Sequence, residues 1–294
     1  MAASPALDRA AADYRLGLAG IIVSGVFTSL AGILVRLVEA ADGWTLLFYR
    51  MAAFLVFMAV FLGWRYGRRL PFAFLALGRS GLLISLTMSV AFVSFVFALI
   101  ETTVAQVVFI GSTTPLFASL LAWVFLKERL PLSTWIAMGV AVLGVAVMVG
   151  EGISGGSLLG TLLALAMMLS FSLTLIGMRA AKTHDSLPAV AMAGVIILLV
   201  SAAMTPSFAI SGWDLGVATV FGVVQLGFQY VLVTFGARHV PAGEIAFFAR
   251  IQVILAPLWV WIGVGEVPSD LTLIGGGVVI AAVAFNSIAR LRAS

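Results

Sequence analysis

The segment TVAQVVFIGSTTPLFASLLAWVFLKERLPLSTWIAMGVAVLG, residues 103–144, joins two long apolar runs through the short polar stretch KERLP. Each run is long enough for an α-helix to cross a hydrocarbon core of about 30 Å. The runs are continuous, whereas strands of a membrane barrel alternate between apolar and polar residues. Because an unpaired backbone group in lipid costs several kcal/mol, the segment predicts two membrane-spanning helices.

The rest of the chain has the same character. Hydrophobic residues make up 63% of the 294 positions and charged residues 10%, whereas soluble domains are about 45–50% apolar and about 25% charged. Breaks at charged residues, prolines and glycines divide the chain into ten runs of spanning length. We therefore predict an all-α integral membrane protein with a tail at 1–15 and transmembrane helices at 16–37, 45–66, 77–99, 104–126, 132–150, 157–178, 187–204, 213–236, 242–262 and 271–290.

Basic residues indicate how these helices are oriented. With ten spans, both termini lie on one side of the membrane, and the loops on that side carry thirteen of the sixteen lysines and arginines. The opposite loops carry only Arg36, and Arg50 and Arg250 lie inside spans. Because cytoplasmic loops are enriched in basic residues, we expect both termini in the cytoplasm and a location in the cell inner (plasma) membrane.

The chain contains an internal repeat. A shift of 138 positions places Thr103–Gly144 on Pro241–Ala282 without a gap, and a shift of 143 places Arg36 on Arg179. The first shift aligns Trp123 with Trp261, Glu128 with Glu266, Ile136 with Ile274 and Gly139 with Gly277. We expect a first five-helix repeat at 16–150 and a second at 157–290. An odd number of spans per repeat inverts the second copy, an arrangement typical of secondary transporters.

Several motifs resemble the drug/metabolite transporter superfamily, in particular its ten-helix branch of paired EamA-type units. In the first half these motifs are FYR at 48–50 and TTPLFASLLAWVFLKERL at 113–130. In the second half they are PAGEIAFF at 241–248, APLWVW at 256–261, GEVPS at 265–269 and LIGGGVVIAAV at 273–283. The resemblance covers nearly the whole chain. It implies two inverted repeats and the export of small metabolites.

Within that superfamily the sequence looks most similar to amino-acid exporters, including those of the aromatic amino-acid type. The resemblance leads us to expect an acidic residue in the ninth span, where this chain has Gln252. This departure puts a family coupling role for that position in doubt. We retain Gln252 as a candidate substrate-binding residue.

Arg250 is the clearest candidate for a functional charge. It lies about 12 Å along the ninth span at about 1.5 Å per residue, too deep to reach the interface easily. Its guanidinium could hold a substrate carboxylate, or it could pair with Glu244 or with helix carbonyls. Glu244 follows Pro241 near a helix start, where capping is favoured over proton coupling. For Arg50, early in the second span, we favour a structural role, reaching the interface or pairing with Asp42.

Polar and proline residues suggest further parts of a transport path. Gln225 and Gln229 are four residues apart and next to Tyr230, so they could line a polar path from one helix face. Gln106 and Thr87 could contribute to the same path or form interhelical hydrogen bonds. These five residues are candidate substrate-binding residues. Pro115 and Pro257 are hinge candidates, because proline frees backbone groups within a span.

Small and acidic residues in the repeat receive structural interpretations. Gly139, Gly144 and the run 275–277 are expected to let helices approach closely. Glu128 and Glu266 end equivalent spans on opposite faces of the membrane. We assign these two glutamates to interface salt bridges and loop capping, and we exclude them from the substrate site.

Other functional classes have little support in the sequence. The chain has no cysteine and only two histidines, His184 and His239, and it has no HExxH or Walker motif. GISGG at 152–156 matches GxSxG by letter, but it lies in a glycine-rich loop without the strand and helix of a nucleophile elbow. An intramembrane enzyme and a channel-like facilitator remain the alternatives. We expect no catalytic residue, cofactor, metal or nucleic-acid partner.

We therefore predict a secondary transporter that exports small metabolites, in particular neutral or aromatic amino acids, by alternating access around a central cavity between the repeats. Its partners are the small-molecule substrate and the lipid bilayer. The sequence leaves the oligomeric state open, and a monomer is compatible with it.

Overall fold

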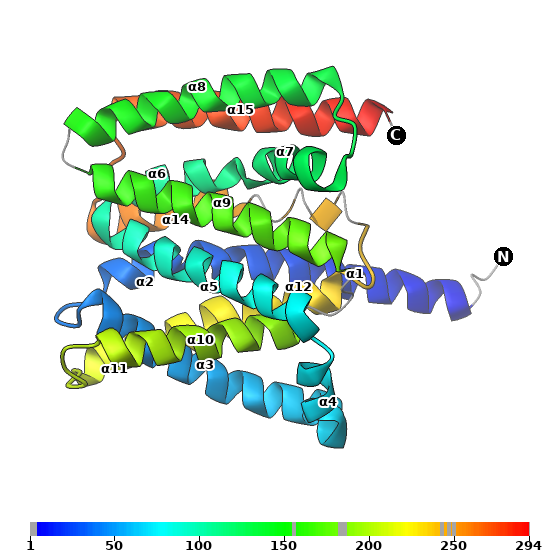
Figure 1. The fold of residues 1–294 in the computed structure, drawn as a ribbon, viewed down its shortest axis with the longest axis vertical. Helices are drawn as coiled ribbons and strands as arrows, with labels where there is room; N and C mark the ends of the chain where they lie inside the picture. The colour runs from blue at the N-terminus through cyan, green and yellow to red at the C-terminus, as the bar shows by residue number, and fades with distance from the viewer. Residues whose placement is uncertain are drawn as a thin grey trace.

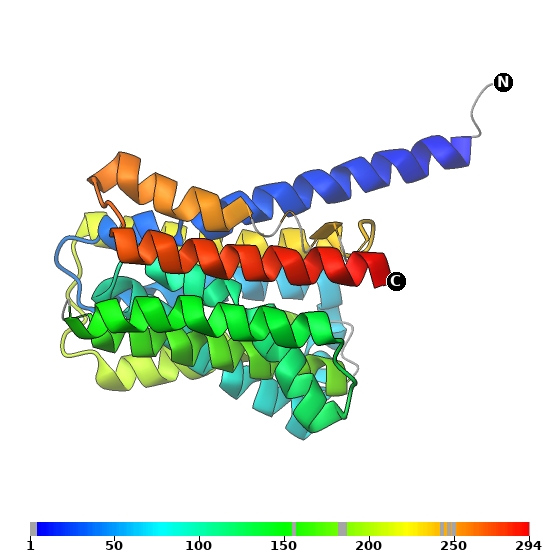
Figure 2. The same cartoon turned by 90° about the horizontal axis from the view of Figure 1, so that it is seen from above.

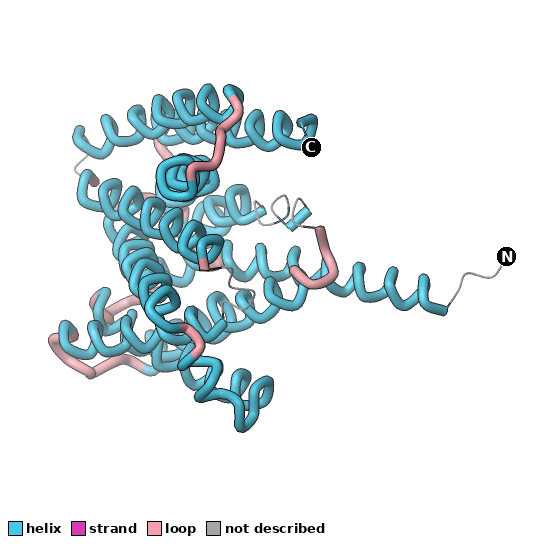
Figure 3. The backbone as a smooth tube through the Cα atoms, turned by 45° about the vertical axis from the view of Figure 1, so that its right-hand side comes forward, coloured by secondary structure: helices cyan, strands magenta, loops and turns pink. Residues whose placement is uncertain are grey.

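The structure, a computed structural model, describes residues 5–154, 157–181, 187–241, 244–245, 248 and 251–293. Every regular element in these ranges is helical (Figure 3). The first half contains α1 (Pro5–Ser29), α2 (Ala31–Arg36), α3 (Gly43–Tyr66), η1 (Gly67–Arg69), α4 (Leu70–Leu75), α5 (Gly78–Glu101), α6 (Val104–Ser112), α7 (Thr114–Leu126) and α8 (Leu132–Ser154). The second half contains α9 (Leu158–Ala180), α10 (Leu187–Met204), α11 (Gly212–Val220), η2 (Phe221–Phe228), α12 (Gln229–Gly236), α14 (Ile251–Val264) and α15 (Asp270–Ala293).

Membrane-length helices account for most of this structure and confirm the predicted fold class. Within the described residues, nine helices are long and apolar enough to cross a membrane. The shorter apolar helix α14 lies where the ninth span is expected. The second span differs from expectation, because η1 and α4 extend it beyond residue 66 to Leu75. Both chain ends lie at the same end of the bundle (Figures 1 and 2).

Helix packing repeats with the two halves exchanged. The first-half helix α5 packs against the second-half helix α9, and the first-half helix α1 packs against the second-half helix α14. The equivalent pairs repeat these contacts with the halves exchanged, since the second-half helix α12 packs against the first-half helix α1, and the second-half helix α9 packs against the first-half helix α7. The last helices of the two halves, α8 and α15, lie side by side, as do α3 and α10 (Figure 1). These exchanged contacts are those of two inverted copies related by a pseudo-twofold axis.

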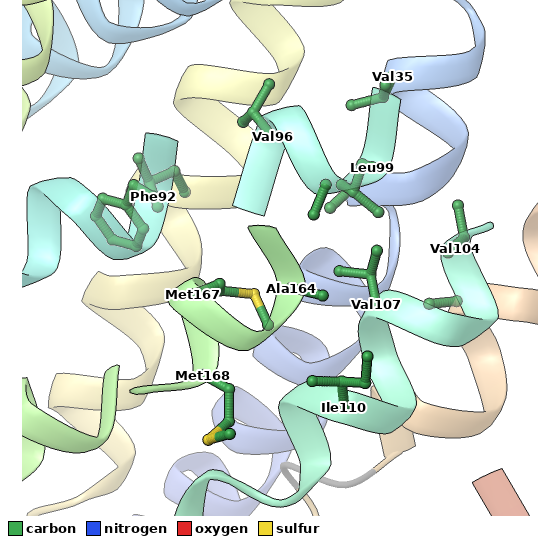
Figure 4. Packing of buried hydrophobic residues seen from close by; sticks show 14 of the residues in the cluster. Val35, Phe92, Val96, Leu99, Val104, Val107, Ile110, Ala164, Met167 and Met168 are labelled. Carbon is green, nitrogen blue, oxygen red and sulfur yellow. The ribbon is translucent and has the colours of Figure 1, made fainter. Parts of the chain in front are cut away.

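The buried core joins the two halves. Phe92, Leu99 and Ile110 of the first half pack with Ala164 and Met167 of α9 (Figure 4). Gly222 of η2 approaches α3 so closely that a Cβ atom there would collide with the carbonyl oxygen of Arg50. Such close contacts matter in a membrane, because packing replaces much of the hydrophobic driving force between helices.

Of the glycines expected to allow close helix approach, only some do so. A Cβ atom at Gly144 would lie 2.6 Å from the carbonyl oxygen of Gly275, and one at Gly275 would lie 2.7 Å from that of Gly144. A Cβ at Gly276 would collide with the Phe109 ring. The expectation was wrong for Gly139 and Gly277, where a Cβ would meet no atom of the described structure within 4 Å. These two residues point away from the α8–α15 contact.

A buried carboxylate connects the two halves at the end of the bundle that lies opposite the termini. Asp214 of α11 is fully buried and accepts hydrogen bonds from the backbone N–H groups of Glu39, Ala40 and Ala41 at 2.9, 3.0 and 3.0 Å. The negative charge of the carboxylate strengthens these three bonds. The α2–α3 loop of the first half is thereby attached to the second half.

We predict that Asp214→Asn destabilises the protein. The amide keeps one acceptor oxygen and adds a donor that faces backbone donors, so at least one buried N–H loses its partner, at a cost of about 1–3 kcal/mol. The thermal unfolding midpoint in detergent measures this loss. Asp270→Asn, in the exposed first turn of α15, is the matched control and should leave the midpoint nearly unchanged. Equal midpoints for the two variants would contradict the assigned role.

Candidate functional site

A cavity of 530 Å³ lies between the two halves. Its walls come from α1, α2, α3, α5, α6 and α7 of the first half and from α9, η2, α12 and α14 of the second. Cavities of roughly 300–1,000 Å³ are typical of small-molecule sites. The volume and the contribution of both halves make this the candidate substrate site.

Aromatic rings form much of the cavity wall. Phe92, Phe95, Phe171 and Tyr230 all line it. The Phe92 ring meets those of Phe171 and Tyr230 edge to face, with centroids 5.6 and 6.2 Å apart. Edge-to-face pairs hold aromatic rings in defined positions, so the wall offers an ordered apolar surface to a ligand.

Arg50 is the one charged residue among the described residues that line the cavity. Its side chain is fully buried on α3. Its Nη2 donates a hydrogen bond of 3.1 Å to Oε1 of Gln225, and its Cζ lies 3.9 Å from the centroid of the Phe221 ring. Its Nε and Nη1 have no hydrogen-bond acceptor among the described residues. The guanidinium thus has two buried donor nitrogens without a described partner at the cavity wall.

The expectation that Arg50 reaches the interface or pairs with Asp42 is wrong. Asp42 caps α3 by accepting hydrogen bonds from the backbone N–H groups of Trp44 and Thr45. Outside the membrane-spanning segments, burial raises the pKa of Asp42, but these bonds and that from the Thr45 hydroxyl outweigh it and lower the pKa. The sequence held the relevant signal for Arg50, since a charge inside an apolar span is a candidate functional residue by default.

A local change in helix type positions the residues that face Arg50. The eighth span runs as α-helix through Val220, as π-helix from Phe221 to Phe228, and as α-helix again from Gln229. Both Phe221 and Gln225 contact Arg50 from the π-helical segment. Wide helical turns of this kind are rare and occur frequently at functional sites.

Four of the predicted substrate-binding residues line the cavity: Gln225, Gln229, Tyr230 and Gln252. Arg250 lies outside the described residues. Glu244, its possible partner, accepts a hydrogen bond of 2.6 Å from the Tyr14 hydroxyl. The structure thus brings together polar groups from the eighth and ninth spans, which are separate in the sequence.

Gln106 and Thr87 lie elsewhere and form interhelical hydrogen bonds. Gln106 donates through Nε2 to the Met148 carbonyl at 3.1 Å and to the Thr161 hydroxyl at 2.8 Å, and its Oε1 accepts from the Thr102 hydroxyl. The hydroxyl oxygens of Thr87 and Thr174 are 2.9 Å apart. Neither residue lines the cavity, so of the two interpretations open for them, the geometry favours helix association.

The two hinge candidates differ in their surroundings. Pro115 lines the cavity and stands in the first turn of α7, directly after the break in the fourth span at Thr113. Pro257 lies inside α14, which continues through it. Hinge motion at either position stays a prediction.

A family comparison agrees with this architecture. The model of the EamA-like transporter family matches residues 15–150 and 158–288. The chain belongs to the EamA-like transporter family. Membership identifies a membrane transporter rather than an enzyme, as the sequence predicted, and implies a small-molecule substrate and a lipid environment.

Individual relatives of this EamA-like transporter are distant. The uncharacterized transporter YdfC of Bacillus subtilis (strain 168) is 26% identical over 185 residues, 60% of each chain. An uncharacterized transporter of Archaeoglobus fulgidus is 27% identical over 282 residues, 92% of this chain and 95% of the relative. A solved crystal structure shares the fold with a TM-score of 0.59 and 15% identity, over 95% of this chain and 98% of that one.

Proposed function

We propose that this EamA-like transporter is a secondary carrier that exports small amphiphilic metabolites, in particular neutral or aromatic amino acids, by alternating access. The observation that carries the proposal is the cavity formed jointly by both inverted halves. Two inverted repeats can rock about a shared site and open it to each side in turn. The aromatic rings of the cavity wall suit the apolar side chain of an amino acid, and the polar groups of the wall suit its charged ammonium and carboxylate groups.

We further propose that both termini face the cytoplasm from the plasma membrane. The end of the bundle that carries the termini also carries Arg65, Arg68, Arg79 and Lys127, which lie at or between helix ends (Figure 1). Enrichment of basic residues on the cytoplasmic side supports this orientation.

Transport by the purified protein tests the proposed function. Liposomes that contain only this protein are given a panel of labelled amino acids, with and without a pH gradient, and protein-free liposomes serve as the control. We expect uptake of at least one neutral or aromatic amino acid well above the control. If no member of the panel moves in either condition, the proposed substrate class is wrong.

A further inference from the structure

We propose that Arg50 binds the carboxylate of the transported molecule, so that the substrate class is a monocarboxylate with an apolar body. This inference rests on the proposed function and assigns a binding site within it. An arginine side chain is permanently charged. Arg50 lies in the first third of the span that begins at Gly43. A charge within a span costs up to about 2.5–3.5 kcal/mol on insertion scales, the value at the span centre, unless it gains partners.

The described protein partners of Arg50 compensate this charge only in part. Gln225 supplies one neutral acceptor and Phe221 supplies the face of its ring. Neither brings a negative charge, and the described residues that line the cavity include no Asp or Glu. Nε and Nη1 remain as donors. A carboxylate would supply both the missing charge and the missing acceptors.

The surroundings of Arg50 define the remainder of the ligand. Phe92, Phe171 and Tyr230 line the same cavity on other helices, so a molecule held at Arg50 by its carboxylate can place an aromatic or branched apolar group among these rings. The described lining offers no acidic partner for an ammonium group. The carboxylate is therefore expected to contribute more to recognition than the amine does.

Three probes with the same phenyl body separate these contributions. L-Phenylalanine carries both charges, 3-phenylpropionate carries only the carboxylate, and phenethylamine carries only the ammonium. We measure their effect on the thermal unfolding midpoint of the purified full-length protein and their competition in liposome transport. L-Phenylalanine and 3-phenylpropionate should raise the midpoint and compete, whereas phenethylamine at the same concentration should do neither.

Substitutions then connect the effect to Arg50. Arg50→Gln removes the charge, and Arg50→Lys keeps it but loses the planar guanidinium. Both should weaken the apparent affinity for 3-phenylpropionate by at least about ten-fold, the scale of a lost charge-assisted hydrogen bond. Arg68→Gln, at an exposed position of η1, is the control and should bind as the wild type does. Arg50→Lys keeps the test available if Arg50→Gln does not fold.

The possible outcomes distinguish this inference from the proposed function. Equal stabilisation by phenethylamine and 3-phenylpropionate, unchanged binding by Arg50→Lys, or no binding of any probe to the wild type would each overturn the role of Arg50. Binding of 3-phenylpropionate through Arg50 without transport of any amino acid would leave the Arg50 site standing and contradict the proposed function.

A second, independent observation concerns two Arg–Glu pairs at opposite ends of the bundle. Arg36 Nε lies 2.6 Å from Glu266 Oε2, and Arg179 Nη1 lies 3.9 Å from Glu128 Oε2. The internal repeat aligns Arg36 with Arg179 and Glu128 with Glu266. Each pair therefore takes its arginine from one half and its glutamate from the other, and the pseudo-twofold axis exchanges the two pairs.

Equivalent backbone turns position the two glutamates. Lys127 has a left-handed φ of 56°, and the next N–H, of Glu128, bonds to the carbonyl of Ala122. Gly265 likewise has a left-handed φ of 72°, and the next N–H, of Glu266, bonds to the carbonyl of Val260. These are the C-terminal turns of α7 and α14, spaced by the 138 residues of the repeat. The symmetry thus includes the backbone that carries each carboxylate.

The two pairs differ in how firmly they are closed. The side chains of Arg36 and Glu266 are 24% and 15% exposed, whereas those of Arg179 and Glu128 are 57% and 51% exposed. Arg36 also donates to the carbonyls of Leu99 and Thr102, and Leu99 lines the cavity. An exposed pair contributes little, while a shielded and multiply bonded one holds its helices together. The end opposite the termini is the firmly closed one.

From this we infer that the two pairs are gates that close in alternation. The Arg36–Glu266 pair closes the cavity at the end opposite the termini, and the Arg179–Glu128 pair tightens to about the same geometry when the other end closes. This inference rests on alternating access but not on the identity of the substrate. The structure confirms the salt bridges expected for both glutamates, and Glu266 also caps α6 by accepting from the Val104 N–H at 2.7 Å. The inference adds a gating role to these structural roles.

Accessibility of a cavity cysteine tests the gates. The chain has no native cysteine, so Ser112→Cys, at a cavity-lining position, introduces a single reporter. Its reaction with a membrane-impermeant maleimide is followed in right-side-out and inside-out vesicles. Glu266→Gln should raise the rate of labelling from the side opposite the termini, where the Arg36–Glu266 pair lies, by about two- to five-fold, the scale of a lost ion pair. Glu128→Gln should raise the rate of labelling from the side that carries the termini by a smaller factor.

Glu101→Gln, an exposed residue at the end of α5, is the control and should change neither rate. General loosening of the protein would raise labelling from both ends with each variant. That result, or unchanged rates for both Glu266→Gln and Glu128→Gln, would overturn the gate assignment without bearing on which molecules are transported.

Discussion

Val108→Trp is expected to reduce transport by at least about ten-fold, which corresponds to an increase of about 1.4 kcal/mol in the activation barrier. Val108 lies on α6, and its side chain is half-buried and lines the central cavity. An indole at this position occupies space that the substrate needs. Because the ring extends into a cavity of 530 Å³, the strain that usually accompanies overpacking should be small.

The measurement is the initial rate of uptake in liposomes, together with the stabilisation of the purified protein by 3-phenylpropionate. Both should fall in Val108→Trp. Val142→Trp introduces the same side chain at a position of α8 that is 50% exposed on the outside of the bundle, so it should retain wild-type transport. Equal activity of the two variants would show that the cavity is not on the transport path.

Gly144→Ala is expected to lower the stability of the protein and Gly139→Ala to leave it unchanged or raise it, although the two glycines lie on the same helix. At Gly144 a methyl group would lie 2.6 Å from the Gly275 carbonyl and 2.9 Å from a Val279 methyl. Separating α8 and α15 to make room should cost about 1–3 kcal/mol. At Gly139 the methyl group meets open space, and the gain in helix propensity is about 1 kcal/mol.

Thermal unfolding of the two purified variants in the same detergent provides the comparison. We expect a lower midpoint for Gly144→Ala and an unchanged or higher midpoint for Gly139→Ala. A shared direction of change would mean that the α8–α15 contact does not depend on a small residue at position 144.

Helical class and span positions were predictable because they depend on composition along a single helix. Apolar length and the cost of unpaired backbone groups in lipid apply to each span separately. The second span extends to Leu75 because Pro71, in the first turn of α4, starts a new helix after the left-handed turn at Gly67. Hydropathy alone does not report such a turn.

The candidate site was predictable only in part. Gln225, Gln229, Tyr230 and Gln252 line the cavity, as polar groups in adjacent spans suggested. Gln106 has the same side-chain chemistry, yet its amide group bonds to neighbouring helices. The difference depends on which helix faces the side chain, and a single sequence does not contain that information.

The amino-acid sequence by itself determined that the chain spans a membrane as two five-helix repeats, because apolar length, basic loops and internal similarity are properties of the linear chain. Only the tertiary structure decided that Arg50 faces a cavity, that Gly144 rather than Gly139 touches a neighbouring helix, and that Arg36 meets Glu266 across 230 positions. The physical reason is that these features depend on helix rotation and on contacts between distant segments. In lipid, any apolar face of a span can be accommodated, so hydrophobicity does not specify which face turns inward.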